Sequence, residues 1–373
     1  MGKPKKGRVP VTGHAAAGGA RVLVTGGAGF IGMHLAKALA LRGTADALAG
    51  RGIADGAALC GAVRGSARDE LRGCEVTIAD NLSRGKADAE FKELCALKNV
   101  DFINADLSVH GGTKKLGKPD AFDFVYHLAA INGTRFFYEK PEEVLRVNIS
   151  SALNILEWLK SRKGNGAKII FSSSSEAYAG GVSLGVSKIP TPETAPLVIE
   201  DVKNPRWSYG GSKIAGELLF VNYARRYGFP FSIVRYHNVY GPRMGNEHVI
   251  PEFIMRAQRG ENPFKIQGGG QTRAFCFVDD AVRATIMVAE SEKTVGEIVH
   301  IGNDKEEIKI SELAGRVCRM LGYEPELQVV PSPEGSAMRR CPDITKLRTL
   351  TGFEPKVSLA EGLKKTAEWY LGK

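Results

Sequence analysis

A tyrosine and a lysine four residues apart are the first candidates for chemistry in this sequence. The segment Tyr209-Gly-Gly-Ser-Lys213 opens a helical pattern, and residues at this spacing share one helical face. A lysine cation beside a phenol lowers the pKa of the phenol. The pair therefore predicts a tyrosine that removes a hydroxyl proton while a hydride leaves the same carbon.

A serine-rich segment upstream ends in a carboxylate. It reads Phe171-Ser-Ser-Ser-Ser-Glu-Ala-Tyr178 and follows a predicted strand. We expect its hydroxyls, Ser174 above all, to hydrogen-bond a substrate hydroxyl and Tyr209. The alternative interpretation is an ordinary serine-rich loop.

A glycine-rich turn, Gly26 to Gly32, lies between a β-branched run at 21–25 and a helical pattern at 30–41. Gly26 suits a tight turn, Gly29 lets the backbone approach a pyrophosphate, and Gly32 lets helix and strand pack closely. The N–H groups of the helix N-terminus then face the phosphates. The pattern predicts a dinucleotide site.

An acidic residue, Asp80, ends the second predicted strand, where it would bind the adenosine ribose. A carboxylate repels a 2′-phosphate, which favours NAD over NADP. The usual interval between the glycine turn and this acidic residue is about 20 residues. It is exceeded here because residues 43–73 form an Ala-, Gly- and Arg-rich insertion. Asp106 and Leu107 follow the third strand and could contact adenine, although a strand-end cap explains Asp106 nearly as well.

Strands and helices alternate through the N-terminal half, which predicts a Rossmann-type, doubly wound parallel sheet of the α/β class. Further strands are expected at 75–80, 100–104, 122–127, 168–172 and 231–236, with helices at 141–160 and 212–227. Beyond residue 240 the pattern becomes irregular, with helices at 251–259, 279–290, 310–321 and 359–371. We expect a cofactor domain over 21–240 and a smaller mixed α/β substrate domain over 241–373, with the chain able to cross between them.

Composition narrows the class of protein. Of 373 residues 43% are hydrophobic and 25% charged, and no apolar run reaches the ~18 residues of a membrane span. The net charge of +10 is concentrated partly in residues 1–20, which we expect to be a disordered basic tail. No interleaved aromatic–basic motif supports a nucleic-acid partner. Six cysteines without a CxxC pair predict neither a metal site nor disulfides, and no export signal is evident, so we expect a cytoplasmic protein.

These motifs together resemble the extended short-chain dehydrogenase/reductase family, in its NAD-dependent nucleotide-sugar epimerase/dehydratase branch, over residues 21–371. The matching motifs are GGAGFIG (26–32), DNLS (80–83), HLAA (127–130), Asn148, SSSSEAY (172–178), YGGSK (209–213), RYHNVYGPR (235–243) and QTRAF (271–275). The resemblance implies tightly held NAD, a nucleoside-diphosphate sugar as substrate, and a homodimer joined by helices such as 141–160 and 209–227.

Residue roles follow from the resemblance by matching motif to motif. It implies that Tyr209 is the base, that Lys213 holds the nicotinamide ribose, and that Ser174 binds the reacting hydroxyl. The expected cofactor-binding residues are Gly26, Gly29, Phe30, Ile31, Gly32, Asp80, Asn81, Asp106, Leu107, Leu128, Ala129, Ala130, Asn148, Ser172, Tyr209, Lys213 and Tyr236. The expected substrate-binding residues are Ser174, Asn238, Arg243, Val249, Arg273 and Arg340.

The first step implied by the family is oxidation at sugar C4, and the fate of the resulting ketone depends on further groups. Simple 4-epimerases usually carry a non-ionisable side chain where this chain has Glu176. The Ser174-Ser175-Glu176 run lacks the Asp of common 4,6-dehydratases and is closer to the Thr-Ser-Glu of GDP-mannose dehydratases and UDP-glucuronate decarboxylases. The decarboxylases, however, have an Arg near the position of His248.

Glu176 and His248 correspond to the acid/base pair of GDP-mannose 3,5-epimerase, which makes both candidate catalytic residues. Plain substrate binding is the alternative role for each. We therefore expect an NAD-dependent nucleotide-sugar epimerase of the 4- or 3,5-type. A 4,6-dehydratase or UDP-glucuronate decarboxylase-like lyase is the second hypothesis. A non-catalytic NAD-binding scaffold is the third, and the intact Tyr209 and Lys213 argue against it.

Overall fold

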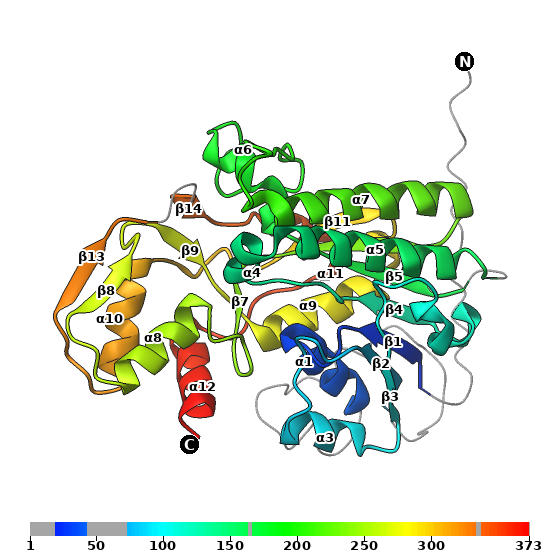
Figure 1. The fold of residues 1–373 in the computed structure, drawn as a ribbon, viewed down its shortest axis with the longest axis horizontal. Helices are drawn as coiled ribbons and strands as arrows, with labels where there is room; N and C mark the ends of the chain where they lie inside the picture. The colour runs from blue at the N-terminus through cyan, green and yellow to red at the C-terminus, as the bar shows by residue number, and fades with distance from the viewer. Residues whose placement is uncertain (1–18, 43–72, 163–165, 333–336, 373) are drawn as a thin grey trace.

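A seven-stranded parallel sheet forms the centre of the computed structural model, which describes residues 19–42, 73–162, 166–332 and 337–372 (Figure 1). The strand order is β11-β6-β5-β4-β1-β2-β3, and every neighbouring pair is parallel. The strands are β1 (Arg21–Thr25), β2 (Glu75–Asp80), β3 (Val100–Asn104), β4 (Phe124–His127), β5 (Lys168–Ser174), β6 (Phe231–Tyr236) and β11 (Glu297–Ile301).

The order of the strands reverses between β1 and β4, which are neighbours in the sheet. In open parallel sheets the crevice for ligands lies at this point, outside the carboxyl ends of the strands. The predicted Rossmann-type fold is confirmed.

Helices cover both faces of the sheet because side chains alternate along each strand. Leu23 belongs to the core beneath α5 (Pro141–Leu159) and α7 (Trp207–Tyr227), whereas Val22 and Val24 belong to the core beneath α1 (Phe30–Ala40) and α9 (Val278–Glu290). Helices α5 and α7 run side by side above the sheet in Figure 1. The remaining helices are α3 (Ala89–Cys95), α4 (Thr134–Glu139), α6 (Ala179–Ser183), α8 (Val249–Gln258), α10 (Ile310–Met320), α11 (Thr345–Thr351) and α12 (Leu359–Leu371).

Smaller sheets lie beside the main one. A parallel pair joins β7 (Val239–Tyr240) to β10 (Cys276–Phe277), and another joins β8 (Phe264–Gln267) to β13 (Leu327–Val330). A third sheet has the order β12-β9-β14, formed by Glu307–Lys309, Thr272–Ala274 and Arg339–Arg340. This sheet carries Arg273 and Arg340 from distant parts of the chain to the same place.

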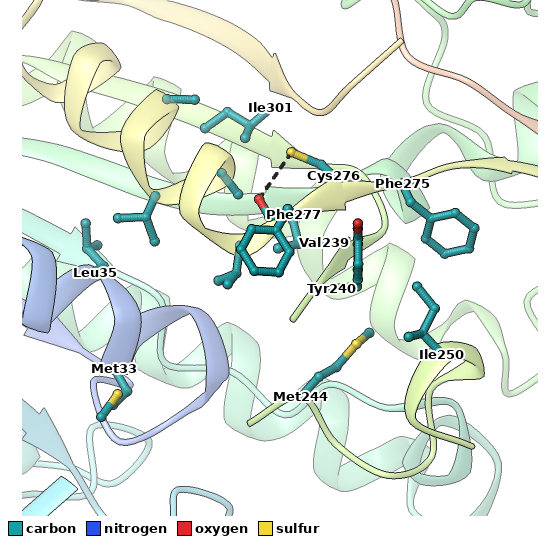
Figure 2. Packing of buried hydrophobic residues seen from close by; sticks show 14 of the residues in the cluster. Met33, Leu35, Val239, Tyr240, Met244, Ile250, Phe275, Cys276, Phe277 and Ile301 are labelled. Carbon is teal, nitrogen blue, oxygen red and sulfur yellow. Dashed lines mark hydrogen bonds between the residues drawn. The ribbon is translucent and has the colours of Figure 1, made fainter. Parts of the chain in front are cut away.

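One continuous apolar core links the helix after the glycine turn to the smaller sheets. Met33 of α1, Tyr240 of β7 and Phe277 of β10 are buried members of one cluster, which Figure 2 shows from close by. Ile250 of α8 belongs to the same cluster. The elements on the substrate side are therefore packed against the cofactor side.

The seventh strand was not predicted from the sequence. Glu297-Ile-Val-His-Ile301 is short and carries two polar side chains, yet it pairs with β6 and extends the main sheet. The chain thus crosses back into the cofactor part after residue 240, and a boundary at that residue remains a prediction. The predicted basic tail (1–20) and insertion (43–73) lie outside the described residues apart from their last residues.

The helices of the described part were also searched for a membrane span. None of them is both long enough and apolar enough to cross a bilayer.

Candidate active site

A cavity of about 630 Å³ lies at the carboxyl ends of β1, β2, β4, β5 and β6. This volume is within the range of small-molecule and cofactor sites. Nearly all of the predicted site residues line it. The exceptions are Asn148 and Arg273.

The glycine turn has the conformation that its residues predict. Gly26 has a φ of +71°, and a Cβ there would lie 2.7 Å from the backbone nitrogen of Ala129. A Cβ on Gly32 would lie 2.2 Å from the carbonyl oxygen of Gly26, so α1 packs against the turn without room for a side chain. Helix α1 has no side-chain cap and no acidic residue in its first turn. Its N-terminal N–H groups therefore suit an anionic ligand.

Asp80, the predicted ribose-binding residue, lines the cavity and is held by backbone groups. Its carboxylate accepts hydrogen bonds from the N–H of Ala28 (3.1 Å) and of Leu82 (2.8 Å). Burial raises the pKa of Asp80. Asn81 donates to Asp106 (3.1 Å), whose pKa is lowered by hydrogen bonds from Ser108 against the opposing effect of burial. The two carboxylates thus mark one end of the cavity.

Tyr209 and Lys213 lie in the first turns of α7, and both line the cavity. The Lys213 ammonium donates to the carbonyl of Ser172 (2.6 Å) and lies 5.5 Å from the centroid of the Tyr209 ring. Burial lowers the pKa of Lys213 to about 7. Burial also raises the pKa of Tyr209, against a hydrogen bond from Ser174. The predicted lowering of the tyrosine pKa is wrong for this structure, because burial raises this pKa and Lys213 is not among the groups that shift it.

A buried ion pair beneath this site was not anticipated from the sequence. Arg235 of β6 binds Glu217 of α7 through two nitrogens at 2.8 Å each, and both side chains are almost fully buried. Ser173 donates to the same carboxylate (2.5 Å). These contacts fix α7, and with it Tyr209 and Lys213, against the ends of β5 and β6. Glu217 stands four residues after Lys213, and that helical spacing could have revealed it.

At the other end of the cavity, Glu176 is paired with two arginines. It accepts hydrogen bonds from Arg340 of β14 and from Arg206 (3.3 Å), the residue before α7. These guanidinium groups lower the pKa of Glu176 despite its burial. Arg206 was missed, although its position three residues before Tyr209 places it one helical turn away. Arg339, the neighbour of Arg340, instead pairs with Glu307 near the surface.

Three predicted residues have contacts that differ from their expected roles. Asn148 lies behind the cavity wall, where its amide bonds Ile131 and Ser212. Arg273 is partly buried beside Arg340 and bonds Gln271 and the carbonyl of Thr272. Its pKa is lowered to about 9 by burial and then by Arg340. Arg243 lines the cavity but directs its guanidinium to Asp88 (2.7 Å).

His248, Val249 and Asn238 line the same cavity as Glu176. His248 precedes α8, and burial lowers its pKa while Glu247 opposes that effect. Asn238 has a φ of +39° and donates to the carbonyl of Ala274 (3.0 Å). The structure therefore brings a carboxylate and an imidazole to one cavity, as the sequence predicted.

The residues that line the cavity suit a dinucleotide. The uncapped α1 terminus, the glycine cradle and the Asp80 carboxylate form an extended site that continues to Tyr209 and Lys213. Among the described residues there is no group of three or more His, Cys, Asp or Glu side chains arranged to bind a metal ion.

Comparison with known proteins places these features in a family. The sequence model of the NAD dependent epimerase/dehydratase family matches residues 54–302. The chain is 35% identical over 360 residues to a UDP-N-acetyl-alpha-D-glucosaminuronate decarboxylase of Bacillus cytotoxicus, covering 94% of this chain and 97% of the relative.

Two solved structures have the same overall fold. A UDP-glucose 4-epimerase of Thermotoga maritima, solved with UDP-glucose, matches with a TM-score of 0.76 and 30% identity, over 94% of this chain and 99% of the other. A UDP-glucuronic acid 4-epimerase of Bacillus cereus, solved with UDP-glucuronic acid and NAD, matches with a TM-score of 0.72 and 28% identity, over the same shares of the two chains.

Proposed function

Because the chain belongs to the NAD-dependent epimerase/dehydratase family, we propose that it oxidises C4 of a nucleoside-diphosphate sugar which carries a carboxylate at C5. NAD is the cofactor, and the chemistry that it supplies when bound is acceptance of the C4 hydride. The observation that carries the substrate proposal is the buried arginine cluster around Glu176.

Tyr209, Ser174 and Lys213 perform the oxidation in this proposal. The Tyr209 oxygen takes the proton of the C4 hydroxyl as the hydride leaves C4, so the C–O single bond becomes a ketone. Ser174, which already hydrogen-bonds Tyr209, orients that hydroxyl. Lys213 is held by the Ser172 carbonyl beside the Tyr209 ring, where its ammonium would bind the nicotinamide ribose.

The charge around Glu176 favours an anionic sugar. Arg206 and Arg340 both pair with this one carboxylate, and Arg273 lies close enough to both for their charges to lower its pKa. The Nε atoms of Arg206 and Arg340 are buried without a hydrogen-bond partner. Buried cations and donors of this kind are costly unless an anion compensates them. A sugar carboxylate bound by Arg340 would supply that anion.

Oxidation at C4 would make such a sugar a β-keto acid, which can lose carbon dioxide. The C5–C6 bond breaks, its electron pair passes to the C4 oxygen, and the enolate is protonated at C5. The C4 alcohol would be regenerated when the hydride is returned to C4 and Tyr209 gives its proton back to the C4 oxygen. Glu176 is the positioning residue for Arg340 in this scheme. We therefore infer a decarboxylase acting on a UDP-linked uronic acid, as the name of the Bacillus cytotoxicus relative suggests.

The epimerase predicted from the sequence is the second candidate. Glu176 and His248 line one cavity, so both acid/base groups needed to invert a carbon beside the ketone are present. Simple inversion at C4 would need neither group. The Bacillus cereus structure holds a uronic acid in a 4-epimerase, so an acidic sugar is compatible with this outcome too.

The mass of the product separates the two reactions. The protein is incubated with UDP-glucuronic acid and with UDP-N-acetylglucosaminuronic acid, and the products are weighed by mass spectrometry. A loss of carbon dioxide supports the proposal. An unchanged mass with new sugar NMR signals contradicts it and establishes the epimerase.

Variants at adjacent residues test the role of the arginine cluster. Arg340→Met should lower carbon dioxide release at least about 100-fold, because it removes the group that binds the carboxylate. Arg339→Met is the matched control, since this neighbour pairs with Glu307 outside the cavity. Equal loss of activity in both variants would contradict the assignment of Arg340.

A further inference from the structure

Two segments far apart in the chain meet beside the cavity. One is the 81–88 segment, between β2 and α3, and the other is the 241–248 segment, between β7 and α8. The first follows Asp80, and the second carries His248. Each contributes residues to the cavity lining.

Two ion pairs join the segments, and the cation comes from a different segment in each pair. Arg84 of the first segment binds Glu247 of the second (3.0 Å), while Arg243 of the second binds Asp88 of the first (2.7 Å). Each segment therefore supplies one cation and one anion. The Arg84 and Glu247 side chains keep about a third of their surface in solvent, at 30% each, which places this pair at the rim of the cavity.

Both segments contain a non-glycine residue in the left-handed region. Leu82 has a φ of +57° and Arg243 a φ of +64°. Such conformations are unfavourable for residues other than glycine and persist where the surrounding contacts hold them. The ion pairs are contacts of that kind.

Each segment is also tied to the glycine turn or to the helix that follows it. Lys86 donates its backbone N–H to the carbonyl of Ala28 (3.3 Å), and His34 of α1 hydrogen-bonds the carbonyl of Pro242 (3.0 Å). The Arg84 guanidinium lies 4.1 Å from the centroid of the Phe136 ring on α4. The two segments therefore enclose the cavity from the side where Asp80 and the glycine turn lie.

We propose that the Arg84–Glu247 and Arg243–Asp88 pairs act as a clasp that retains NAD. A ligand lying along the cavity from Asp80 toward Tyr209 has the 81–88 segment on one side and the 241–248 segment on the other. Release of that ligand requires the segments to separate, and separation breaks both ion pairs. The clasp thus sets the rate at which NAD leaves, whichever reaction the sugar undergoes.

The test measures NAD release from the loaded protein without reference to turnover. Protein with bound NAD is freed of unbound NAD by gel filtration, and the NAD that stays bound is followed over time. Glu247→Gln and Arg84→Gln should each release NAD about fivefold faster, the effect expected of a partly exposed ion pair. The charge-exchanged double variant R84E/E247R should return the rate to within about twofold of the original.

A matched control breaks an ion pair that does not join the segments. Arg316→Gln removes the exposed Arg316–Glu312 pair of α10, outside both segments, and should leave the release rate unchanged. An unchanged rate in Glu247→Gln, or a charge-exchanged variant that releases NAD as fast as the single variants, would overturn the proposal.

The salt dependence of NAD release is a second measurement. The only variant that it requires is the conservative Glu247→Gln. Raising the ionic strength from about 0.05 M to about 0.5 M screens exposed pairs. NAD release from the unmodified protein should accelerate more than release from Glu247→Gln. Equal acceleration in both proteins would count against the clasp.

Discussion

The Lys213 ammonium lies 5.5 Å from the centroid of the Tyr209 ring and donates to the carbonyl of Ser172 at 2.6 Å. One helical turn thus holds a cation beside a phenol, and the end of β5 fixes its direction. Both side chains are buried, so the ligands that fill the cavity change the surroundings on which their ionisation depends.

Tyr209→Phe should leave NAD bound and abolish oxidation of the sugar. Loss of a general base costs about 10²–10⁴-fold in rate, whereas the ring that packs beside Phe137 is retained. Absorbance of the reduced cofactor after substrate addition measures the step. Tyr138→Phe, at an exposed tyrosine of α4, is the control and should behave as the unmodified protein does. Normal oxidation in Tyr209→Phe would remove this residue from the mechanism.

Lys213→Met should stabilise the cofactor-free protein near neutral pH, by on the order of 1–2 kcal/mol. The folded-state pKa of Lys213 is lowered to about 7 from 10.5, so the unfolded chain binds more protons between these values. The cost to the native state is therefore fully present below pH 7 and disappears as the pH rises toward 10.5. Chemical denaturation of both proteins across this range should show the stability difference shrinking with increasing pH.

Lys168→Met is the contrasting variant, because burial lowers the pKa of Lys168 to about 7 as well. This ammonium, however, donates to the carbonyls of Val288 and Ser291 and to the hydroxyl of Thr294, at 2.8 to 2.9 Å. We expect a loss of about 2–3 kcal/mol in the same denaturation experiment. Stabilisation by Lys168→Met would show that these hydrogen bonds contribute little.

Asp80→Ser should weaken the preference for NAD over NADP. The carboxylate that would repel a 2′-phosphate is removed, and a hydroxyl is left that still accepts a backbone hydrogen bond. Titration of the cofactor-free protein should show NAD binding weakened about tenfold and NADP binding strengthened. Asp101→Ser, at an exposed position of β3, is the control. An unaltered ratio of the two affinities would mean that Asp80 does not contact the ribose.

We expect the chain to form a homodimer through α5 and α7, and Leu218→Glu should convert that dimer into a monomer. Leu145 and Leu153 of α5 and Leu218 of α7 are exposed to 38%, 37% and 61%, on two helices that pack side by side. A second copy of this chain that covered them would be disrupted by a buried carboxylate. Sedimentation velocity gives the oligomeric state. Leu184→Glu, at 56% exposure just after α6, should leave it unchanged. A dimeric Leu218→Glu would exclude this face as the interface.

Local patterns predicted most of the fold because they are short-range properties of the chain. The run Arg21 to Thr25, the positive φ of Gly26 and the helix from Phe30 all follow from neighbouring residues. The strand Glu297–Ile301 was missed, since its polar side chains weaken the apolar signal and its pairing with β6 supplies the stabilisation instead.

The sequence predicted the residues of the active site better than it predicted the contacts between them. Tyr209, Lys213, Ser174 and Glu176 line one cavity, as expected. The pairing of Glu176 with Arg340 joins residues 164 positions apart, and no local pattern encodes such a contact. It depends on β14 aligning with β9, which brings Arg340 beside Arg273.

The late position of Arg340 in the chain affects how the protein matures on the ribosome. All seven strands of the main sheet have been translated once Ile301 is made, as have the glycine turn, Tyr209 and Lys213. Glu176, however, still lacks one of its two cationic partners at that stage. A nascent or truncated chain that stops between Ile301 and Arg340 thus contains the cofactor-binding elements without the complete sugar site. In such a chain, the proposed recognition of a sugar acid would have to wait for the C-terminal segment.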